Sequence, residues 1–405
     1  MPDTVVGTAG GPDRTSPAVQ RTQEDHPRGT GPDTMVQLIS PEGERLDPRG
    51  AAEEYAAYVE DVTDDDVRGM YRDMVIVRRF DSEATALQRQ GELGLWASLL
   101  GQEAAQVGSG RALRRQDYVY PTYREHGVAW CKGVPPKTLL GLYRGASLGG
   151  WDPAEHNFAL YTIVIGSQCL HATGYAMGLQ RDHAVGTGEP DRDAAVVAYL
   201  GDGATSQGDV SEALVFSAVY NAPVVFFCQN NQWAISEPNT RQTRVPLFQR
   251  SSGFGIPGVR VDGNDVLATL AVTRAMTERA RSGQGPGFIE AYTYRMGAHT
   301  TSDDPTRYRI AAEVEEWKLK DPIARVKAYL ARSGAADEAW FAEVDAEAKQ
   351  IATELRTACR TMPDPEPESM FDDVYAEPHA VLDAEREEYL AYRAGFADDS
   401  EGASA

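Results

Sequence analysis

Two unbroken apolar runs in the middle of the chain, residues 194–200 and 224–228, constrain its fold more than any other feature. Runs of this length without alternation are typical of strands covered on both faces in a parallel sheet. Between them, apolar residues recur at helical spacing over residues 210–218 and the pattern ends at Pro223, with Ser206 as the expected helix N-cap. The segment therefore predicts a strand–helix–strand unit with two neighbouring parallel strands.

Polar residues suited to binding a cation and a diphosphate follow both predicted strands. Asp202 lies in a Gly-Asp-Gly triplet after the first strand, and Asn231 follows the second. Ligands of open α/β sheets bind beyond the carboxyl ends of the strands, where glycines and a helix N-terminus favour phosphate groups. Carboxylate and amide oxygens are ligands that Mg²⁺ prefers. A lone Gly-Asp-Gly triplet is more often an ordinary turn, so the two strand ends together indicate the site.

The rest of the pattern predicts one extended α/β domain over residues 35–332. A disordered tail at residues 1–34 precedes it, and an acidic helical region at residues 333–405 follows it and is expected to pack on partner subunits. Within the domain we expect a short strand over residues 36–39, a helix capped by Thr63 and running through Val77, a strand over residues 259–261, a helix to about Arg281 and a strand over residues 288–294.

Composition and charge exclude several classes of protein. A net charge of −22 argues against nucleic-acid binding, which needs clustered Lys and Arg. No segment reaches transmembrane length, and residues 1–34 lack the basic start and apolar core of a signal peptide. The cysteines form no CxxC pair and no disulfide or zinc framework, which favours a reduced, cytoplasmic setting: Cys131, Cys169, Cys228 and Cys359.

The interval from Asp202 to Asn231, filled by one helix and one strand, resembles the thiamine diphosphate signature, which begins with GDG and closes with NN. From residue 71 to residue 332 the chain resembles the alpha subunit of the decarboxylating component of three-component 2-oxoacid dehydrogenase complexes. The blocks that carry this resemblance are LQRQGELGLWASLLGQEAAQVGSG, YPTYREHGVAW, NNQWAIS, VRVDGNDV and YRMGAHTTSDDPTRYR. It implies the thiamine diphosphate-binding α/β fold, a parallel sheet flanked by helices, with a helical C-terminal extension.

The resemblance also implies which residues hold the cofactor. Thiamine diphosphate supplies a carbon nucleophile and then takes up the electrons released with CO₂, so the protein mainly orients it. The implied Mg²⁺ ligands are Asp202, Asn231 and the backbone carbonyl of Trp233. The implied diphosphate contacts are Tyr123, Arg124 and the backbone amides of Gly203 and Ala204, and Arg has the shape that binds phosphate in a bidentate manner.

A second segment, YTIVIGSQCLHATG, corresponds to the stretch over which the cofactor bends in the family. There the resemblance implies that Ile163 offers a backbone carbonyl to the aminopyrimidine and that Ile165 is the apolar wedge between the two rings. Some family members have a structural K⁺ site at positions that correspond to Thr162, Val164, Ser167 and Gln168. The alternative is a loop whose oxygens are satisfied internally.

His299 is the acid/base candidate, in a loop that contains Gly and Asp residues. The resemblance gives it a catalytic role near the thiazolium ring, where it would position the lipoyl acceptor or stabilise developing charge. Four further residues could order the loop, although a solvated mobile loop is the alternative: Arg295, Asp303, Tyr308 and Arg309. Mitochondrial relatives carry a phosphorylated Ser directly after this His, whereas this chain has Thr300, so kinase control is not expected.

The resemblance implies that the chain is half of an active site. The glutamate that activates the aminopyrimidine comes from the beta subunit in this family, and Glu103 is expected to be a structural or interface carboxylate. The resemblance thus implies an α₂β₂ heterotetramer that acylates the lipoyl domain of the core acyltransferase. The isolated alpha chain is expected to be inactive.

The expected substrate is a branched-chain 2-oxoacid of the 3-methyl-2-oxobutanoate type, because the loop TTSDDPTRYR resembles that of branched-chain enzymes. Some bacterial pyruvate enzymes have nearly the same loop, so pyruvate is the alternative. An acetoin dehydrogenase should have a different loop after Gly297, and a transketolase-like enzyme needs a longer chain. A non-catalytic scaffold is disfavoured because the expected binding residues are intact.

Overall fold

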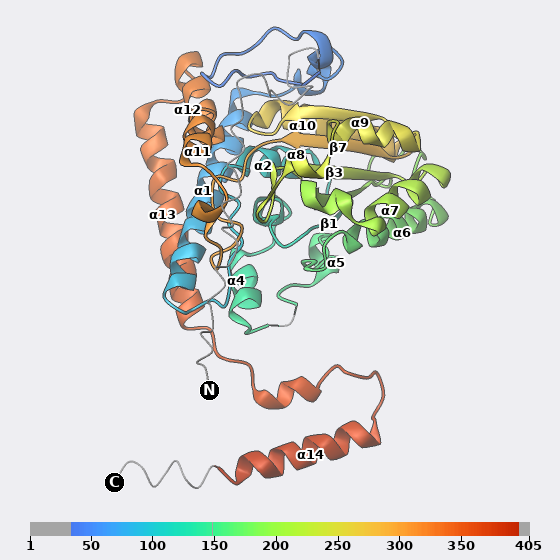
Figure 1. Ribbon diagram of the computed structural model, residues 1–405, viewed down its shortest axis with the longest axis vertical. Coiled ribbons are helices and arrows are strands. Elements are labelled where there is room, and N and C mark those ends of the chain that lie inside the picture. Colours follow the sequence, from blue (N-terminus) through green and yellow to red (C-terminus); the bar gives the residue numbers. More distant parts are fainter. Residues whose placement is uncertain (1–33, 148, 397–405) are drawn as a thin grey trace, which may run out of the picture.

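The computed structural model describes residues 34–147 and 149–396 and is built around a five-stranded parallel sheet (Figure 1). The strand order is β1-β2-β3-β7-β6, so the last strand of the chain, β7, lies between β3 and the edge strand β6. The strands are β1 (Tyr118–Tyr120), β2 (Val196–Gly201), β3 (Val224–Asn230), β6 (Gly258–Asp262) and β7 (Gly287–Tyr292), and a separate hairpin pairs β4 (Trp233–Ala234) with β5 (Glu237–Pro238). The predicted parallel α/β sheet is therefore confirmed.

Helices cover both faces of the sheet (Figure 1). On one face lie α6 (Ser167–Arg181) and α7 (Gly208–Val219), and on the other lie α1 (Asp64–Arg89), α2 (Glu103–Ala112) and α10 (Val266–Arg281). The remaining helices are α3 (His126–Cys131), α4 (Pro136–Arg144), α5 (Pro153–His156), α8 (Asn239–Gln242), α9 (Leu247–Ser251), α11 (Ala311–Lys318), α12 (Pro322–Ser333), α13 (Glu338–Arg360) and α14 (Ala380–Ala394).

Alternation along the strands explains why the two sequence runs are apolar throughout. In β2, Val197 and Tyr199 enter the larger core with α1, α2 and α10, whereas Val196 and Ala198 enter the smaller core with α6 and α7. Each residue of the run is therefore buried against one helical layer or the other. None of the helices within residues 34–147 and 149–396 is both long enough and apolar enough to span a membrane.

Several expected boundaries differ from the observed ones. Thr63 caps α1 as predicted, but the helix continues past Val77 to Arg89 because its buried stripe extends through Phe80 and Leu87. Ser206 does not cap α7, because residues 202–206 form a tight 3₁₀ turn (η3) and α7 begins after Gln207.

At the start of the domain, Val36 and Ile39 form only isolated bridges, to Val261 and Arg45, and not the predicted strand. The predicted tail at residues 1–34 lies outside the described residues, apart from Thr34.

The region after residue 332 divides into two parts. Helix α13 packs against α1 of the same chain, with Phe341, Val344 and Leu355 in the main core. Helix α14 stands apart from the body, beyond a long connection, and has no buried residue (Figure 1). The packing of residues 333–405 on partner subunits stays a prediction.

Helices α2 and α10 approach closely at Gly108. A Cβ atom at this position would lie 2.7 Å from the carbonyl oxygen of Val266 and 2.9 Å from Cβ of Thr269. Contacts this short force backbone or side-chain shifts, because protein interiors are already close-packed. Glycine is therefore required where the two helices cross.

We predict that Gly108→Ala lowers the stability of the chain by about 1–3 kcal/mol, the usual cost of overpacking. The matched control is Gly178→Ala on α6, where nothing lies within 4 Å of the added Cβ. This second change should raise stability by about 0.5–1 kcal/mol, because Ala is the better helix former. Urea unfolding of both variants tests this, and an equal shift in both would contradict the packing argument.

Candidate functional site

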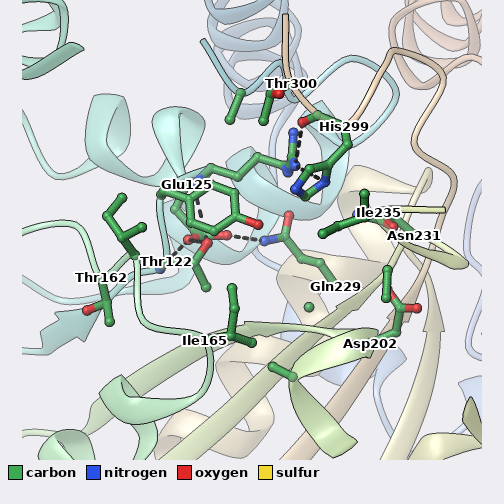
Figure 2. A pocket seen from close by; sticks show the side chains of 18 of the residues that line it. Thr122, Glu125, Thr162, Ile165, Asp202, Gln229, Asn231, Ile235, His299 and Thr300 are labelled. Carbon is green, nitrogen blue, oxygen red and sulfur yellow. Dashed lines mark hydrogen bonds between the residues drawn. The ribbon is translucent and has the colours of Figure 1, made fainter. Parts of the chain in front are cut away.

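A cavity of about 430 Å³ opens at the carboxyl ends of β2 and β3. The two strands are in register up to the pair Gly201 and Gln229, so the residues after each strand meet at the same edge of the sheet. Asp202 and Asn231 both line this cavity, as predicted from the strand ends, and lie together at one end of it (Figure 2).

Asp202 is a buried carboxyl group without a cationic partner among the described residues. It begins the η3 turn, its side chain is 1% exposed, and Oδ2 accepts a 3.1 Å hydrogen bond from Nε2 of Gln242. Burial raises the pKa of Asp202 to about 6. A divalent cation at this position would relieve that penalty, because opposite charge favours the ionised form.

The Asn231 amide is held in one orientation. Its Nδ2 donates to Oε1 of Gln102 at 3.1 Å, and its Oδ1 accepts from the backbone N–H of Trp233 at 3.2 Å. The intervening Gln232 has a φ of 70°, and its backbone N–H donates to Oδ1 of Asn230 at 3.1 Å. This tight turn brings the Trp233 backbone back to the cavity.

Arg124 approaches the cavity from the segment between β1 and α3. Its guanidinium donates to the carbonyl of Ser98 and, at 2.9 Å, to the carbonyl of His299. The ring of the neighbouring Tyr123 meets the His299 ring edge-on, with centroids 6.1 Å apart. Arg124, Tyr123 and His299 all line the cavity, so the structure brings the predicted diphosphate contacts and the predicted acid/base residue together.

The neighbours of His299 determine its charge and tautomer. Its Nδ1 lies 3.2 Å from Nη2 of Arg124 and 3.3 Å from Nη1 of Arg295. Guanidinium groups only donate, so Nδ1 accepts and the proton of the neutral ring is on Nε2. Burial, together with the charges of Arg124 and Arg295, lowers the pKa of His299 to about 3. The side chain is therefore a neutral hydrogen-bond donor at physiological pH.

Arg295 has a larger role than ordering its own loop. It is fully buried, and it donates to the carbonyl oxygens of Trp233 at 3.1 Å and of Ile235 at 2.7 Å. Burial and the charge of Arg124 lower the pKa of Arg295 to about 10. Arg295 thus fixes the Trp233 backbone whose carbonyl is the third expected metal ligand.

The expected ordering of the loop is observed. Tyr308 accepts from Arg295 at 3.1 Å and donates to Asp303, which also accepts from the backbone N–H of His299 at 2.9 Å. Arg309 donates to the carbonyls of Arg295 and Met296. These contacts hold the His299 backbone in one place.

The charges around the cavity fit a complex of a cation with a polyanion. Arg124 and Arg295 are buried, and their guanidinium groups form no ion pair within residues 34–147 and 149–396. The buried carboxyl group of Asp202 also forms no ion pair with these residues. Uncompensated buried charges are costly, so a ligand carrying both signs is favoured. No cluster of three or more His, Cys, Asp or Glu that could hold a metal occurs in that part of the chain, so a metal here would also need amide and carbonyl oxygens.

The segment between α5 and α6 forms another part of the cavity wall. Ile163 and Ile165 both line the cavity and are 63% and 40% exposed. The carbonyl of Val164, one of the expected K⁺ ligands, accepts from Oγ of Ser167 at 2.9 Å, whereas Oε1 of Gln168 is buried without a hydrogen-bond partner in the described structure. The loop is thus satisfied internally in part, and the K⁺ site stays a prediction.

Several polar residues of the cavity wall were not predicted from the sequence, among them Thr122, Glu125 and Gln229. Glu125 accepts from Nε2 of Gln229 at 2.6 Å and from the hydroxyl of Thr122, and burial raises the pKa of Glu125 (Figure 2). A signal for Gln229 was available, because it lies in β3 two residues before Asn231, and residues two apart in an extended chain point to the same side. Glu103, expected to be structural, is fully buried and pairs with Arg78 at 2.8 Å outside the cavity wall.

The sequence of the chain is similar to known proteins over most of its length. A sequence model of the dehydrogenase E1 component family matches residues 71–368. The 3-methyl-2-oxobutanoate dehydrogenase subunit alpha of Mycobacterium tuberculosis is 46% identical over 88% of this chain and 93% of its own length. The pyruvate dehydrogenase E1 component subunit alpha of Staphylococcus aureus is 40% identical over 68% of this chain and 73% of its own length. The protein of the same name from Staphylococcus epidermidis is 36% identical over 85% of this chain and 89% of its own length.

We predict that the ring signals of His299 do not titrate between pH 8 and pH 5, because its pKa lies near 3. Arg124→Gln should raise this pKa by removing one of two nearby cations. NMR of the chain labelled at the His rings measures both, and the spectrum of His299→Gln assigns the signal among the seven His residues. Titration of wild-type His299 near pH 6.5 would contradict the assigned neutral state.

Proposed function

Since the chain belongs to the dehydrogenase E1 component family, we propose that it is the alpha subunit of a thiamine diphosphate-dependent 2-oxoacid dehydrogenase. The proposed reaction is oxidative decarboxylation of a 2-oxoacid, with transfer of the acyl group to a lipoyl group of the core acyltransferase. The observation that carries this proposal is the cavity that combines the uncompensated Asp202 carboxyl with the uncompensated Arg124 guanidinium.

Thiamine diphosphate, when bound, supplies the carbon nucleophile and the electron sink for decarboxylation. In this proposal Asp202, the Asn231 amide and the Trp233 carbonyl hold Mg²⁺, which suits oxygen ligands. Tyr123, Arg124 and the backbone amides of Gly203 and Ala204 hold the diphosphate, and Arg295 supports the same charge from behind the cavity wall. Ile163 would offer its backbone carbonyl to the aminopyrimidine, and Ile165 would be the apolar wedge between the two rings of the cofactor.

His299 has a proposed catalytic role as a hydrogen-bond donor. Its Nδ1 faces two guanidinium groups, which leaves the Nε2–H to donate to charge that develops in the cavity. A neutral imidazole with a pKa near 3 is a weak base, so we assign it stabilisation of charge or positioning of the lipoyl acceptor, and not abstraction of a proton from substrate.

Neither carboxyl group of the cavity wall is available to activate the aminopyrimidine, which favours a contribution from a partner subunit. The described wall contains two carboxyl groups, Asp202 and Glu125. The first is assigned to the metal, and the second is already engaged by Gln229 and Thr122. We therefore propose that the carboxylate that activates the aminopyrimidine comes from a beta subunit in an α₂β₂ assembly.

Two observations favour a branched-chain 2-oxoacid as substrate. The relative named for 3-methyl-2-oxobutanoate matches at 46% identity over 88% of the chain, whereas the Staphylococcus aureus pyruvate enzyme matches at 40% over 68%. The cavity wall also includes apolar contacts from Leu95, Ala97 and Tyr143 that can receive an alkyl group. Pyruvate is the second candidate because its enzymes are also relatives.

We predict that Asp202→Ala weakens Mg²⁺-dependent binding of thiamine diphosphate by about a hundredfold or more, since even indirect metal contacts contribute about 10–100-fold. Calorimetric titration of the α₂β₂ complex measures the effect. Asp209→Ala, at an exposed position in the first turn of α7, is the control and should bind like wild type. Unchanged affinity in Asp202→Ala would remove this residue from the metal site.

The substrate assignment is tested with the chain co-expressed with its beta subunit, by following decarboxylation of pyruvate and of 3-methyl-2-oxobutanoate. We expect kcat/KM to favour the branched substrate by about tenfold or more, since one methylene in an apolar pocket changes binding by about 1–3 kcal/mol. The reverse preference would support the pyruvate candidate. An assembled tetramer that binds the cofactor but turns over neither acid would contradict the proposed reaction class.

A further inference from the structure

The segment Leu95–Leu100, between α1 and α2, has no regular secondary structure. It forms hydrogen bonds with Arg124 and with the loop that carries His299. The carbonyl of Ser98 accepts from the Arg124 guanidinium. Leu95 and Ala97 themselves line the cavity. The position of this segment therefore bears directly on where the Arg124 side chain lies.

The same segment holds the loop that carries His299 on both sides of that residue. Before it, the backbone N–H of Met296 donates to the carbonyl of Leu100 at 3.1 Å. After it, the N–H of Thr301 donates to the carbonyl of Trp96 at 2.9 Å, and the N–H of Trp96 donates to Oγ1 of Thr301 at 3.0 Å. A shift of Leu95–Leu100 would thus move His299 together with Arg124.

One buried carboxyl group on α1 fixes this segment to the core. Asp81 is 2% exposed, and its Oδ1 accepts from Nε1 of Trp96 at 2.8 Å and from the N–H of Leu99 at 3.2 Å. Its Oδ2 accepts from Oγ of Ser98 at 2.6 Å. Three donors of one short segment thus converge on one side chain.

A second buried group supports the segment from α3. Nε2 of His126 donates to the carbonyl of Ala97 at 2.9 Å, and the Trp96 ring stacks on the His126 ring with centroids 4.2 Å apart. Asp81 differs from His126 in the residues that it binds. It accepts from Ser98, whose carbonyl binds Arg124, and from Trp96, whose backbone binds the His299 loop at Thr301.

We propose that Asp81 is a positioning residue of the active site, which sets Arg124 and the His299 loop through Leu95–Leu100. Asp81 is not one of the residues that line the cavity, so it acts only through those groups. The expected effect of Asp81 on cofactor binding rests on the proposed function. The expected effect of Asp81 on the His299 loop does not depend on that function.

The chain supplies a matched control on the same helix. Asp73 is also buried, and it accepts from Nε1 of Trp130 at 2.9 Å and from Nε of Arg111 at 2.6 Å. It thus has the same chemistry, a buried carboxyl group that binds a Trp indole N–H, but its partners are not in Leu95–Leu100. A purely structural role for Asp81 would make the two positions equivalent.

The test compares Asp81→Ala, Asp81→Asn and Asp73→Ala in the full chain co-expressed with its beta subunit. Hydrogen exchange of peptides covering residues 296–301 is measured first, without cofactor. We expect faster exchange there in Asp81→Ala and no change in Asp73→Ala, although both lose thermal stability. Asp81→Asn should exchange almost as wild type, because an amide oxygen can still accept from Trp96 and Leu99.

Calorimetric titration with Mg²⁺ and thiamine diphosphate is the second readout. The dissociation constant should rise about tenfold in Asp81→Ala, the change expected when one charge-assisted hydrogen bond is lost. It should stay near the wild-type value in Asp73→Ala and recover in Asp81→Asn. If Asp81→Ala fails to assemble, Ser98→Ala is used instead. It removes the contact to Oδ2 of Asp81 together with the 3.2 Å hydrogen bond from the N–H of Leu100 to Oγ of Ser98, and a smaller rise in both readouts is expected.

Equal exchange at residues 296–301 in the Asp81→Ala and Asp73→Ala variants would overturn the proposal. So would unchanged exchange and affinity in Ser98→Ala, where that variant is used. Failure of the wild-type complex to bind thiamine diphosphate would instead contradict the proposed function, and the exchange data would still decide the role of Asp81.

Discussion

The parallel pairing of β2 with β3 is the constraint on which the site depends. Gly201 pairs with Gln229, so both strands end at the same level and Asp202 and Asn231 follow at one edge. Because side chains alternate along a strand, a slip of one residue would turn the residues of one strand to the other face. Strands β1 and β7 flank this pair, so β2 and β3 both lie in the interior of the sheet.

The site is also defined by charges that the chain does not neutralise itself. Asp202 is supported by the neutral amide of Gln242, and Arg295 by the carbonyls of Trp233 and Ile235. These dipoles lower the cost of burial without removing the net charge. Burial, together with the charges of Arg124 and Arg295, holds His299 neutral, so the same buried cations affect both the binding preference of the cavity and the protonation of His299.

The sequence predicts well those features that repeat or that follow directly from strand ends. The apolar runs located β2 and β3, and the residues after them located one end of the cavity. The contacts of Asp81 with Trp96 and Ser98 were not predictable in this way, because single hydrogen bonds between an irregular segment and a helix leave no period in the sequence. Tertiary burial likewise extended α1 beyond Val77, a boundary that local pattern alone placed too early.

Two guanidinium groups lie enclosed in a molecule whose net charge is −22. An anionic ligand diffusing toward the chain is therefore repelled at long range and attracted only after it has entered the cavity, the opposite of electrostatic steering. Dissolved salt screens exposed charges beyond about 10 Å at 0.1 M and affects buried ones much less. Moderate ionic strength thus speeds the encounter of such a ligand with this chain while leaving its enclosed contacts largely intact.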